Sequence, residues 1–449
     1  MFAKTNPMVD TNIKIIEELK AYLMIIKSEI DLKVIFTENP TDFTRESKLN
    51  FECTIYLIMN MLKRSLSVEI NDFFGLIAPN IKYTKAAFCL QRKKLNPLFF
   101  EFWNKLFVDS FYRHYGENVK KWKDLLLIAI DGSTTNLVNS AEVISHFGTQ
   151  SNQFTKVPLA RIIKYYDVLN KINIFSKISP ITTGEQAIVT QNIDKLPENS
   201  LSIYDRGFPS YVLMYLHIHQ ERTRNFLMRC KVDFNKTVIE FMQSSEVDVV
   251  VEMFPNKKAI SSLHDLKHTI FEHTTIKVRM IKVILETGET EVLLTNLYDT
   301  ETYPTSYFKE LYFMRWGIET SYNADKNTQQ LEQFSGQSVR SIEQDFYALI
   351  FVSNLQSLIE KQCEPYLLVI NSKRKHNYKV NKNVSIGSMK HKIVQLFLSE
   401  HPEKILLHLQ HLFQQNIEPI RPNRNNPRQM NRNRKRGKFK TLTNYKRAI

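Results

Sequence analysis

The feature that most constrains this fold is a continuous apolar run at residues 125–130, which ends at Asp131-Gly132-Ser133. Six apolar residues without a polar face suit a strand that is covered on both sides, as in a sheet between helices. The run therefore predicts a central strand with a carboxylate, Asp131, at its end. A turn or a cap is the other common reason for an Asp at such a position.

Further strands and helices alternate after this run. Residues 160–169 and 172–178 have the composition of two strands joined by a short turn, and a helix is predicted at 184–194. A second short apolar run at 201–204 ends in Asp205-Arg206-Gly207-Phe208, and Ser210 begins another helix. A fifth strand is predicted at 225–229. An Asp thus follows a strand twice.

The remaining central region predicts an insertion and a closing helix. Residues 232–300 are β-rich, with a turn at Thr287-Gly288, and a helix is predicted from Ser306 to about Asn327. Three strands, a helix, a strand, a helix, another strand, an insertion and a helix form the order of a ribonuclease-H-like core. The predicted fold class is α/β, with a mixed sheet, a β-strand insertion and helical flanks.

The flanking regions are predicted to be helical or basic. Residues 1–120 are predicted to be a helical DNA-binding region, 121–345 the catalytic domain, and 346–420 a helical C-terminal region. The basic segment at 82–95 is either a helix laid against phosphates or the charged outer face of a packing helix.

Most of the net charge lies in a C-terminal tail. Of the formal charge of +15, eleven positive charges and no negative ones fall within 421–449, so the first 420 residues carry about +4. The tail cannot bury a core, and its charge favours a polyanion such as nucleic acid. A solvated end without a partner is the alternative.

One stripe of charged residues stands out in the predicted closing helix. Tyr312, Arg315, Glu319 and Lys326 follow one another at steps of three, four and seven, which places them on one helical face. The stripe is either a solvated face with an ion pair or part of a site to which Asp131 and Asp205 belong. Three carboxylates suit two Mg²⁺ ions, or Mn²⁺, because hard cations prefer oxygen ligands and two such ions assist phosphodiester chemistry.

The joint pattern resembles the DDE transposases of bacterial insertion sequences, in the fourth insertion-sequence family. Members show the same Tyr, Arg, Glu and Lys spacing, Asp-Gly-Ser after a first strand, and Asp-Arg-Gly-Phe after a fourth. The resemblance implies that Asp131, Asp205 and Glu319 are the metal ligands and catalytic residues. It also implies cut-and-paste movement of DNA that carries terminal inverted repeats.

The same resemblance implies DNA contacts and partners. Tyr312, Arg315 and Lys326 would hold terminal phosphates, and Trp316 would stack on a flipped base unless it only packs in the core. Arg206 would contact DNA or only tether its turn. Double-stranded DNA, target DNA and a second copy of the chain in a DNA-bound homodimer are the expected partners.

Other readings find little support in the sequence. The four cysteines form no CxxC, the histidines lack ligand spacing, and neither a phosphate-binding glycine loop nor a nucleophile elbow is present. Without a leader or a membrane span, we expect a bacterial cytoplasmic protein, associated with the nucleoid when it is bound to DNA. A related nuclease that cuts without joining, and an inactive DNA-binding regulator, remain the alternative functions.

Overall fold

The computed structural model describes residues 7–45, 47–80, 82–151, 156–219, 224–285 and 288–421. The chain divides into two compact units. The first unit contains Met1–Phe99, Asn323–Ser335 and Phe351–Ile449, and the second contains Phe100–Tyr322 and Gly336–Ile350. Apart from Arg421, the basic tail predicted at 421–449 lies outside the described residues.

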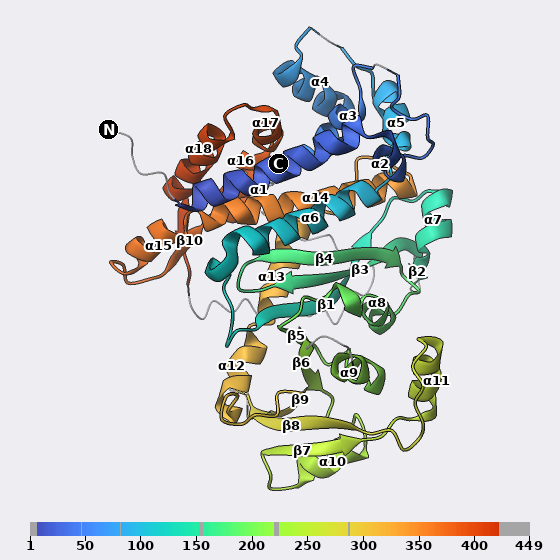
Figure 1. The fold of residues 1–449 in the computed structure, drawn as a ribbon, viewed down its shortest axis with the longest axis vertical. Coiled ribbons are helices and arrows are strands. Elements are labelled where there is room, and N and C mark those ends of the chain that lie inside the picture. Colours follow the sequence, from blue (N-terminus) through green and yellow to red (C-terminus); the bar gives the residue numbers. More distant parts are fainter. Residues whose placement is uncertain are drawn as a thin grey trace, which may run out of the picture. The chain divides into compact units, whose positions relative to one another are not determined.

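A large mixed sheet forms the centre of the second unit (Figure 1). Its strands are β1 (Leu126–Asn136), β2 (Thr149–Ser151), β3 (Lys156–Asp167), β4 (Ile172–Pro180), β5 (Ser200–Tyr204), β6 (Arg224–Cys230), β7 (Asp248–Met253), β8 (Ile276–Ile284) and β9 (Thr290–Thr295).

The strand order identifies the fold class. Strand β1 pairs antiparallel with β3 and parallel with β5, β3 pairs antiparallel with β4, and β5 pairs parallel with β6. Beyond β6, the strands β9, β8 and β7 continue the sheet in antiparallel pairs. This is the predicted ribonuclease-H-like mixed sheet, and the inserted strands extend it.

The apolar runs form the core as the sequence predicted. The first five residues of β1 and all five of β5 are buried, because helices cover the sheet on both faces. Leu127, Leu201 and Leu227, from three neighbouring strands, belong to one buried cluster that also includes Phe308 and Leu311. The segment that follows the insertion is therefore packed against the central strands.

Four helices of the second unit begin at well-defined side-chain caps. The side chains of Ser140, Ser210, Asn235 and Asn256 each accept a hydrogen bond from a backbone N–H in the first turn of a helix. The helices are α7 (Ala141–Phe147), α8 (Glu185–Gln191), α9 (Tyr211–Ile218), α10 (Lys236–Gln243), α11 (Lys257–Asp265), α12 (Phe308–Phe313) and α13 (Trp316–Asn323), with short 3₁₀ turns at Gly116–Asn118, Ile193–Lys195 and Thr305–Tyr307.

The insertion differs from its prediction. Two helices, α10 and α11, lie among its strands, because the capping side chains Asn235 and Asn256 each start an amphipathic helix whose apolar face is buried. At the predicted turn, Gly288 has a φ of 83°, which suits glycine, while Thr287 lies outside the described residues.

The first unit is mainly helical, as predicted for both flanking regions. Helix α1 packs against α2, α3, α17 and α18, so segments from the two ends of the chain share one core. The elements are α1 (Pro7–Ser28), α2 (Ile30–Ile35), α3 (Phe51–Met59), α4 (Leu66–Ile77), α5 (Lys85–Lys94), a π-helical turn (Ala324–Thr328), α15 (Glu364–Asn371), α16 (Lys382–Met389), α17 (Lys392–Leu398), α18 (Pro402–Gln415) and the paired strands β10 (Tyr378–Val380) and β11 (Ile417–Pro419).

Two long helices contribute residues to both units, namely α6 (Leu98–Tyr115) and α14 (Val339–Lys361). Among the described residues, no helix is both long enough and apolar enough to cross a membrane.

Candidate active site

The two aspartates lie where the parallel pairing of β1 and β5 ends. The last paired residues are Ile130 and Tyr204, so Asp131 and Asp205 are the next residues on two adjacent strands that run in the same direction. Each carboxylate accepts a hydrogen bond from the next backbone N–H, at 2.8 Å for Asp131 and 2.7 Å for Asp205. The carboxyl ends of parallel strands are where ligand sites of open α/β sheets are usually built.

One detail of the prediction for Asp131 is wrong. Strand β1 does not end before Asp131 but continues to Asn136, because its antiparallel pairing with β3 continues after its pairing with β5 has stopped. Asp205, in contrast, does begin a turn after β5. Asp131 therefore lies within a strand, whereas Asp205 lies at the start of a turn.

The closing helix is interrupted, which the sequence did not predict. Helix α12 ends at Phe313 and α13 begins at Trp316, while the backbone N–H groups of Arg315 and Gly317 donate to carbonyls three residues earlier. This tighter turn replaces the expected continuous helix from Ser306 to about Asn327. A Cβ atom on Gly317 would lie 3.2 Å from the side chain of Val168, so glycine permits this close packing.

The interrupted helix brings Arg315 between the three predicted carboxylates. Its guanidinium Nη1 lies 3.3 Å from Asp131 Oδ2, and Nη2 lies 2.8 Å from Glu319 Oε1 and 4.0 Å from Asp205 Oδ2. The Tyr312 hydroxyl donates to Asp205 Oδ1 at 3.1 Å. Five of the eight predicted site residues thus meet in one cluster of the second unit, here called the carboxylate cluster.

Burial distinguishes these groups. Arg315 is only 4% exposed, whereas the side chains of Asp131, Asp205 and Glu319 are 20%, 33% and 30% exposed. The Nε of Arg315 has no hydrogen-bond partner within the described part of the chain. The guanidinium is therefore enclosed, and the carboxylates remain open to a ligand that approaches from solvent.

The two aspartates have opposite electrostatic environments. Burial raises the pKa of Asp131 to about 6, against the nearby charge of Arg315, and Asp205 and Glu185 raise it further. Burial also raises the pKa of Asp205, but the Arg206 N–H, the charge of Arg315 and the Tyr312 hydroxyl together lower it below its ordinary value. Sites that perform proton or metal chemistry often contain carboxylates in such different environments.

The donor set suits divalent cations. Three carboxylates and one guanidinium leave two formal negative charges, and all the donors are hard oxygens. Within the described ranges, no three His, Cys, Asp or Glu side chains lie close enough to share one ion. The arrangement fits metal ligation by its chemistry, while Arg315 is the cation that the carboxylates contact in this structure.

The other three predicted site residues differ in their surroundings. Lys326 lies in the π-helical turn of the first unit and is half-buried, and burial lowers its pKa against the charges of Glu332 and Asp325. Trp316 is 50% exposed, which argues against the alternative that it packs in the core. Arg206 is exposed on the turn after Asp205.

Lys164 is a nearby cation that the sequence analysis missed. It lies directly opposite Asp131 on β3, is fully buried, and donates through Nζ to Ser321 Oγ at 2.6 Å. Its ammonium lies 5.0 Å from the ring centre of Tyr322, whose hydroxyl donates to the backbone carbonyl of Asp131. A Lys within the apolar run 160–169 was the signal, because an inward position there is costly for a charge.

A carboxylate on the opposite face of β1 was also missed. Glu185, at the start of α8, is bound by Arg161 at 2.6 Å, and a Cβ atom on Gly132 would come within 2.3 Å of its carboxyl group. The Gly of the Asp-Gly-Ser motif therefore leaves space for this ion pair. Its φ is not in the left-handed region, so conformational freedom is not the reason.

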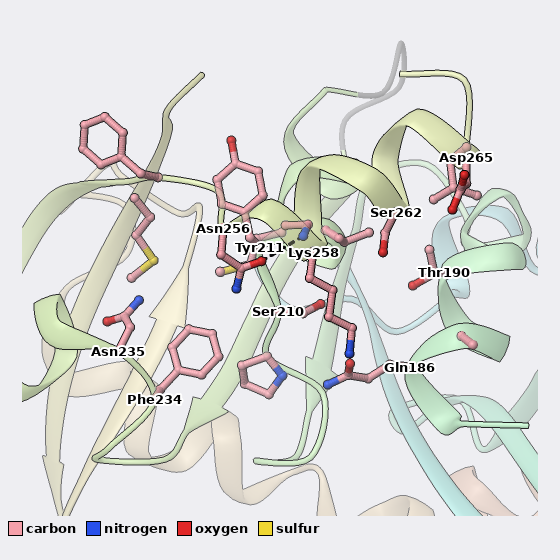
Figure 2. A pocket seen from close by; sticks show the side chains of 18 of the residues that line it. Gln186, Thr190, Ser210, Tyr211, Phe234, Asn235, Asn256, Lys258, Ser262 and Asp265 are labelled. Atoms are coloured by element: carbon pink, nitrogen blue, oxygen red, sulfur yellow. Dashed lines mark hydrogen bonds between the residues drawn. The ribbon is translucent and has the colours of Figure 1, made fainter. Parts of the chain in front are cut away.

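A cavity of about 730 Å³ adjoins the Asp205 turn. Figure 2 shows that helices α8 and α11 supply side chains to it, among them Gln186 and Lys258, which point toward the same part of the cavity. The Gln186 amide donates to the Gly207 carbonyl at 2.8 Å, so the cavity wall is tied to the turn that carries Asp205. Its lining mixes polar side chains with apolar ones such as Phe234.

Comparison with solved structures gives a structural likeness. No family model matches the chain, and no curated protein matches it. A cryo-EM structure of the piggyBac transposase synaptic complex with hairpin DNA aligns over 90% of this chain and 84% of that chain, with 10% identity and a TM-score of 0.42. This TM-score is too low for the likeness to bear on function.

Proposed function

We propose that this protein is a transposase that cleaves DNA strands at terminal inverted repeats and joins them to target DNA. The observation that carries the proposal is the meeting of Asp131, Asp205 and Glu319 around one buried arginine. Two of these carboxylates follow adjacent parallel strands, and the third comes from the helix after the insertion. The resemblance to the fourth insertion-sequence family of DDE transposases rests on the same residues.

In this proposal Asp131, Asp205 and Glu319 hold two Mg²⁺ or Mn²⁺ ions. Such ions would neutralise charge at the phosphorus, activate water or a 3′-hydroxyl, and stabilise the leaving oxygen. The protein's own groups prepare the ligands. The Tyr312 hydroxyl and the Arg206 N–H orient the carboxylate of Asp205, and Arg315 limits repulsion among the three negative charges.

DNA contacts complete the proposal. By the family resemblance we assign Tyr312, Arg315 and Lys326 to terminal phosphates, although Arg315 is enclosed by its carboxylates here and would have to be released from them to reach one. We assign the exposed Trp316 to stacking on an unpaired base. Arg206 is free to reach a phosphate, since it is exposed beside the site. Two copies of the chain would hold two DNA ends in the active assembly.

The test is cleavage of DNA that carries the ends flanking the gene, in the presence of Mg²⁺. Glu319→Gln should reduce cleavage by at least about a thousandfold while DNA binding persists, because the change removes a metal ligand and leaves phosphate contacts in place. The matched control is Glu310→Gln, an exposed carboxylate on α12, which should cleave like the wild type.

The product separates the proposal from its rivals. Joining of a 3′-hydroxyl end to a plasmid supports a transposase, while cleavage without any joined product supports a nuclease. If wild type and Glu319→Gln bind the ends and neither cuts, the protein is a DNA-binding regulator. If both cut equally, the catalytic site is elsewhere and the assignment is wrong.

A further inference from the structure

A second charged site lies in the first unit, far along the sequence from the carboxylate cluster. A cavity of about 700 Å³ is lined by residues from α1, α2, the loop after α2 and the start of α3. Four of its lining residues are cations, namely Lys27, Lys33, Arg45 and Lys48. We call it the cationic cavity.

The cavity keeps an excess of positive charge after its ion pair is counted. Its one described carboxylate, Glu52, binds Lys27 at 2.9 Å, which neutralises that lysine. Arg45 and Lys48 are exposed and have no ion-pair partner among the residues that the structure describes, although Glu46 in the same loop lies outside them. Three cations therefore remain to attract an anion.

Lys33 is the residue that suggests a ligand. Its side chain is 8% exposed, and within the described ranges its ammonium has neither a hydrogen-bond nor an ion-pair partner. The buried stem of Lys33 leads to an ammonium that lines the cavity, where it can attract an anion from solvent. An anion in the cavity would supply that partner.

The start of α3 adds a favourable dipole. Asn50, Phe51 and Glu52 line the cavity, so the positive end of this helix of nine residues is adjacent to it. Backbone N–H groups at a helix start commonly bind phosphate oxygens. This feature agrees with Lys33 but would not suffice without it.

We propose that the cationic cavity binds phosphate groups of the DNA backbone. Lys33 would contact one phosphate inside the cavity, while Arg45 and Lys48, at the solvent-exposed loop, would contact its neighbours along the strand. The phosphate chemistry follows from the cavity itself, and the choice of DNA as its source rests on the proposed function.

This site differs from the basic segment predicted at residues 82–95. That segment forms helix α5, but its Arg92 is 5% exposed and donates through Nη1 to Ser335 Oγ at 2.6 Å. Part of its basic character therefore serves packing. The cationic cavity has no periodic signal in the sequence, because its cations come from three separate elements.

The experiment measures the affinity of the full-length protein for a fluorescent DNA duplex of unrelated sequence over a series of salt concentrations. Lys33→Met and the double variant Arg45→Gln/Lys48→Gln should each bind more weakly. The slope of log K against log salt should become shallower by about one unit per phosphate contact removed. Lys404→Gln, an exposed lysine on α18 outside the cavity, is the matched control and should keep the wild-type slope.

Unchanged slopes in both cavity variants would overturn the proposal, and so would an equal loss of slope in Lys404→Gln. Thermal unfolding of each variant checks that weaker DNA binding does not come from misfolding. The double variant should unfold like the wild type, because it changes only exposed side chains. Inorganic phosphate provides a further arm. If phosphate stabilises the wild type but not Lys33→Met, and the DNA slopes stay unchanged, the cavity binds free phosphate rather than DNA.

The outcome can be separated from that of the proposed function. Cleavage with Mg²⁺ tests the carboxylate cluster, whereas the salt slope is measured without metal and tests the cavity. A protein that never cleaves but loses slope in the cavity variants would retain this inference and reject the transposase. If the protein cleaves DNA and the cavity variants keep the wild-type salt slope, the transposase proposal stands and this inference is rejected.

Discussion

The carboxylate cluster and the cationic cavity each contain a cationic side chain that is largely buried, but only one of the two has an ion-pair partner among the described residues. Arg315 has three carboxylates within 4.0 Å, whereas Lys33 has no partner among the described residues. Removing a buried charge that has partners leaves those partners uncompensated, which lowers stability. A buried charge without partners reduces stability until a ligand arrives, so the same degree of burial has opposite meanings at the two sites.

The largest effect is expected from removing the paired cation. Arg315→Met should lower the free energy of unfolding by about 3–5 kcal/mol in metal-free buffer, because three carboxylates lose their shared counter-charge. Urea denaturation measures this loss. Mg²⁺ should restore more stability to the variant than it adds to the wild type, since the bare carboxylates gain a cation. Equal stability of both proteins without metal would show that Arg315 is not the stabilising partner.

A smaller effect of opposite sign is expected from Asp131. Its folded pKa of about 6 exceeds the ordinary 3.8, so the folded state holds the proton more tightly and wild-type stability falls as pH rises between these values. The amide in the Asp131→Asn variant cannot ionise, so the stability of the variant does not fall as pH rises through this range. Above pH 6, in metal-free buffer, the variant should be more stable by about 2–3 kcal/mol.

The pH dependence is the control for this prediction. Near pH 3.8 the advantage of Asp131→Asn should largely disappear, because the wild-type carboxyl is then protonated in the folded state. Asp205→Asn should show the reverse behaviour, since the lowered pKa of Asp205 means that its charged form is favoured by folding. An advantage for Asp131→Asn that did not vary with pH would point to packing rather than charge.

The smallest effect is expected from the unpaired cation. Lys33→Met should leave the free energy of unfolding unchanged or raise it by up to about 1 kcal/mol, because Met keeps the packing of the buried stem and removes a positive charge beside Arg45 and Lys48. Thermal unfolding in phosphate-free buffer is the measurement. A clear loss of stability would mean that Lys33 is paired after all, and the contrast between the two sites would fail.

Sequence patterns predicted the order of the strands well, for a physical reason. Runs such as 125–130 and 201–204 are buried on both faces, so their apolar character is continuous and easy to recognise. The two aspartates could be predicted from the same runs, since each directly follows one. Glu319 and Arg315 could be joined to them only through the family resemblance, because nothing local indicates which strand a helix will face.

What the sequence did not predict depends on tertiary contacts. The interruption at Arg315 is next to Gly317, which packs closely against Val168 from a distant part of the chain. Lys164 contacts side chains of α13, which is remote in sequence, and Lys33 is buried within its own region of the chain without any periodic signal. A lysine looks the same in the sequence whether it ends on the surface or in the interior, so both were overlooked.

The continuation of β1 beyond Asp131 has a consequence for motion at the site. Asp131 is held within a strand that pairs with β3 on to Asn136, while Asp205 belongs to a turn. Backbone amides inside a sheet exchange with solvent only in rare, large openings, whereas those of a turn exchange through local fluctuation. One wall of the site is thus rigid and the other compliant, so adjustment to successive ligands would come from movement of the Asp205 turn against a fixed Asp131.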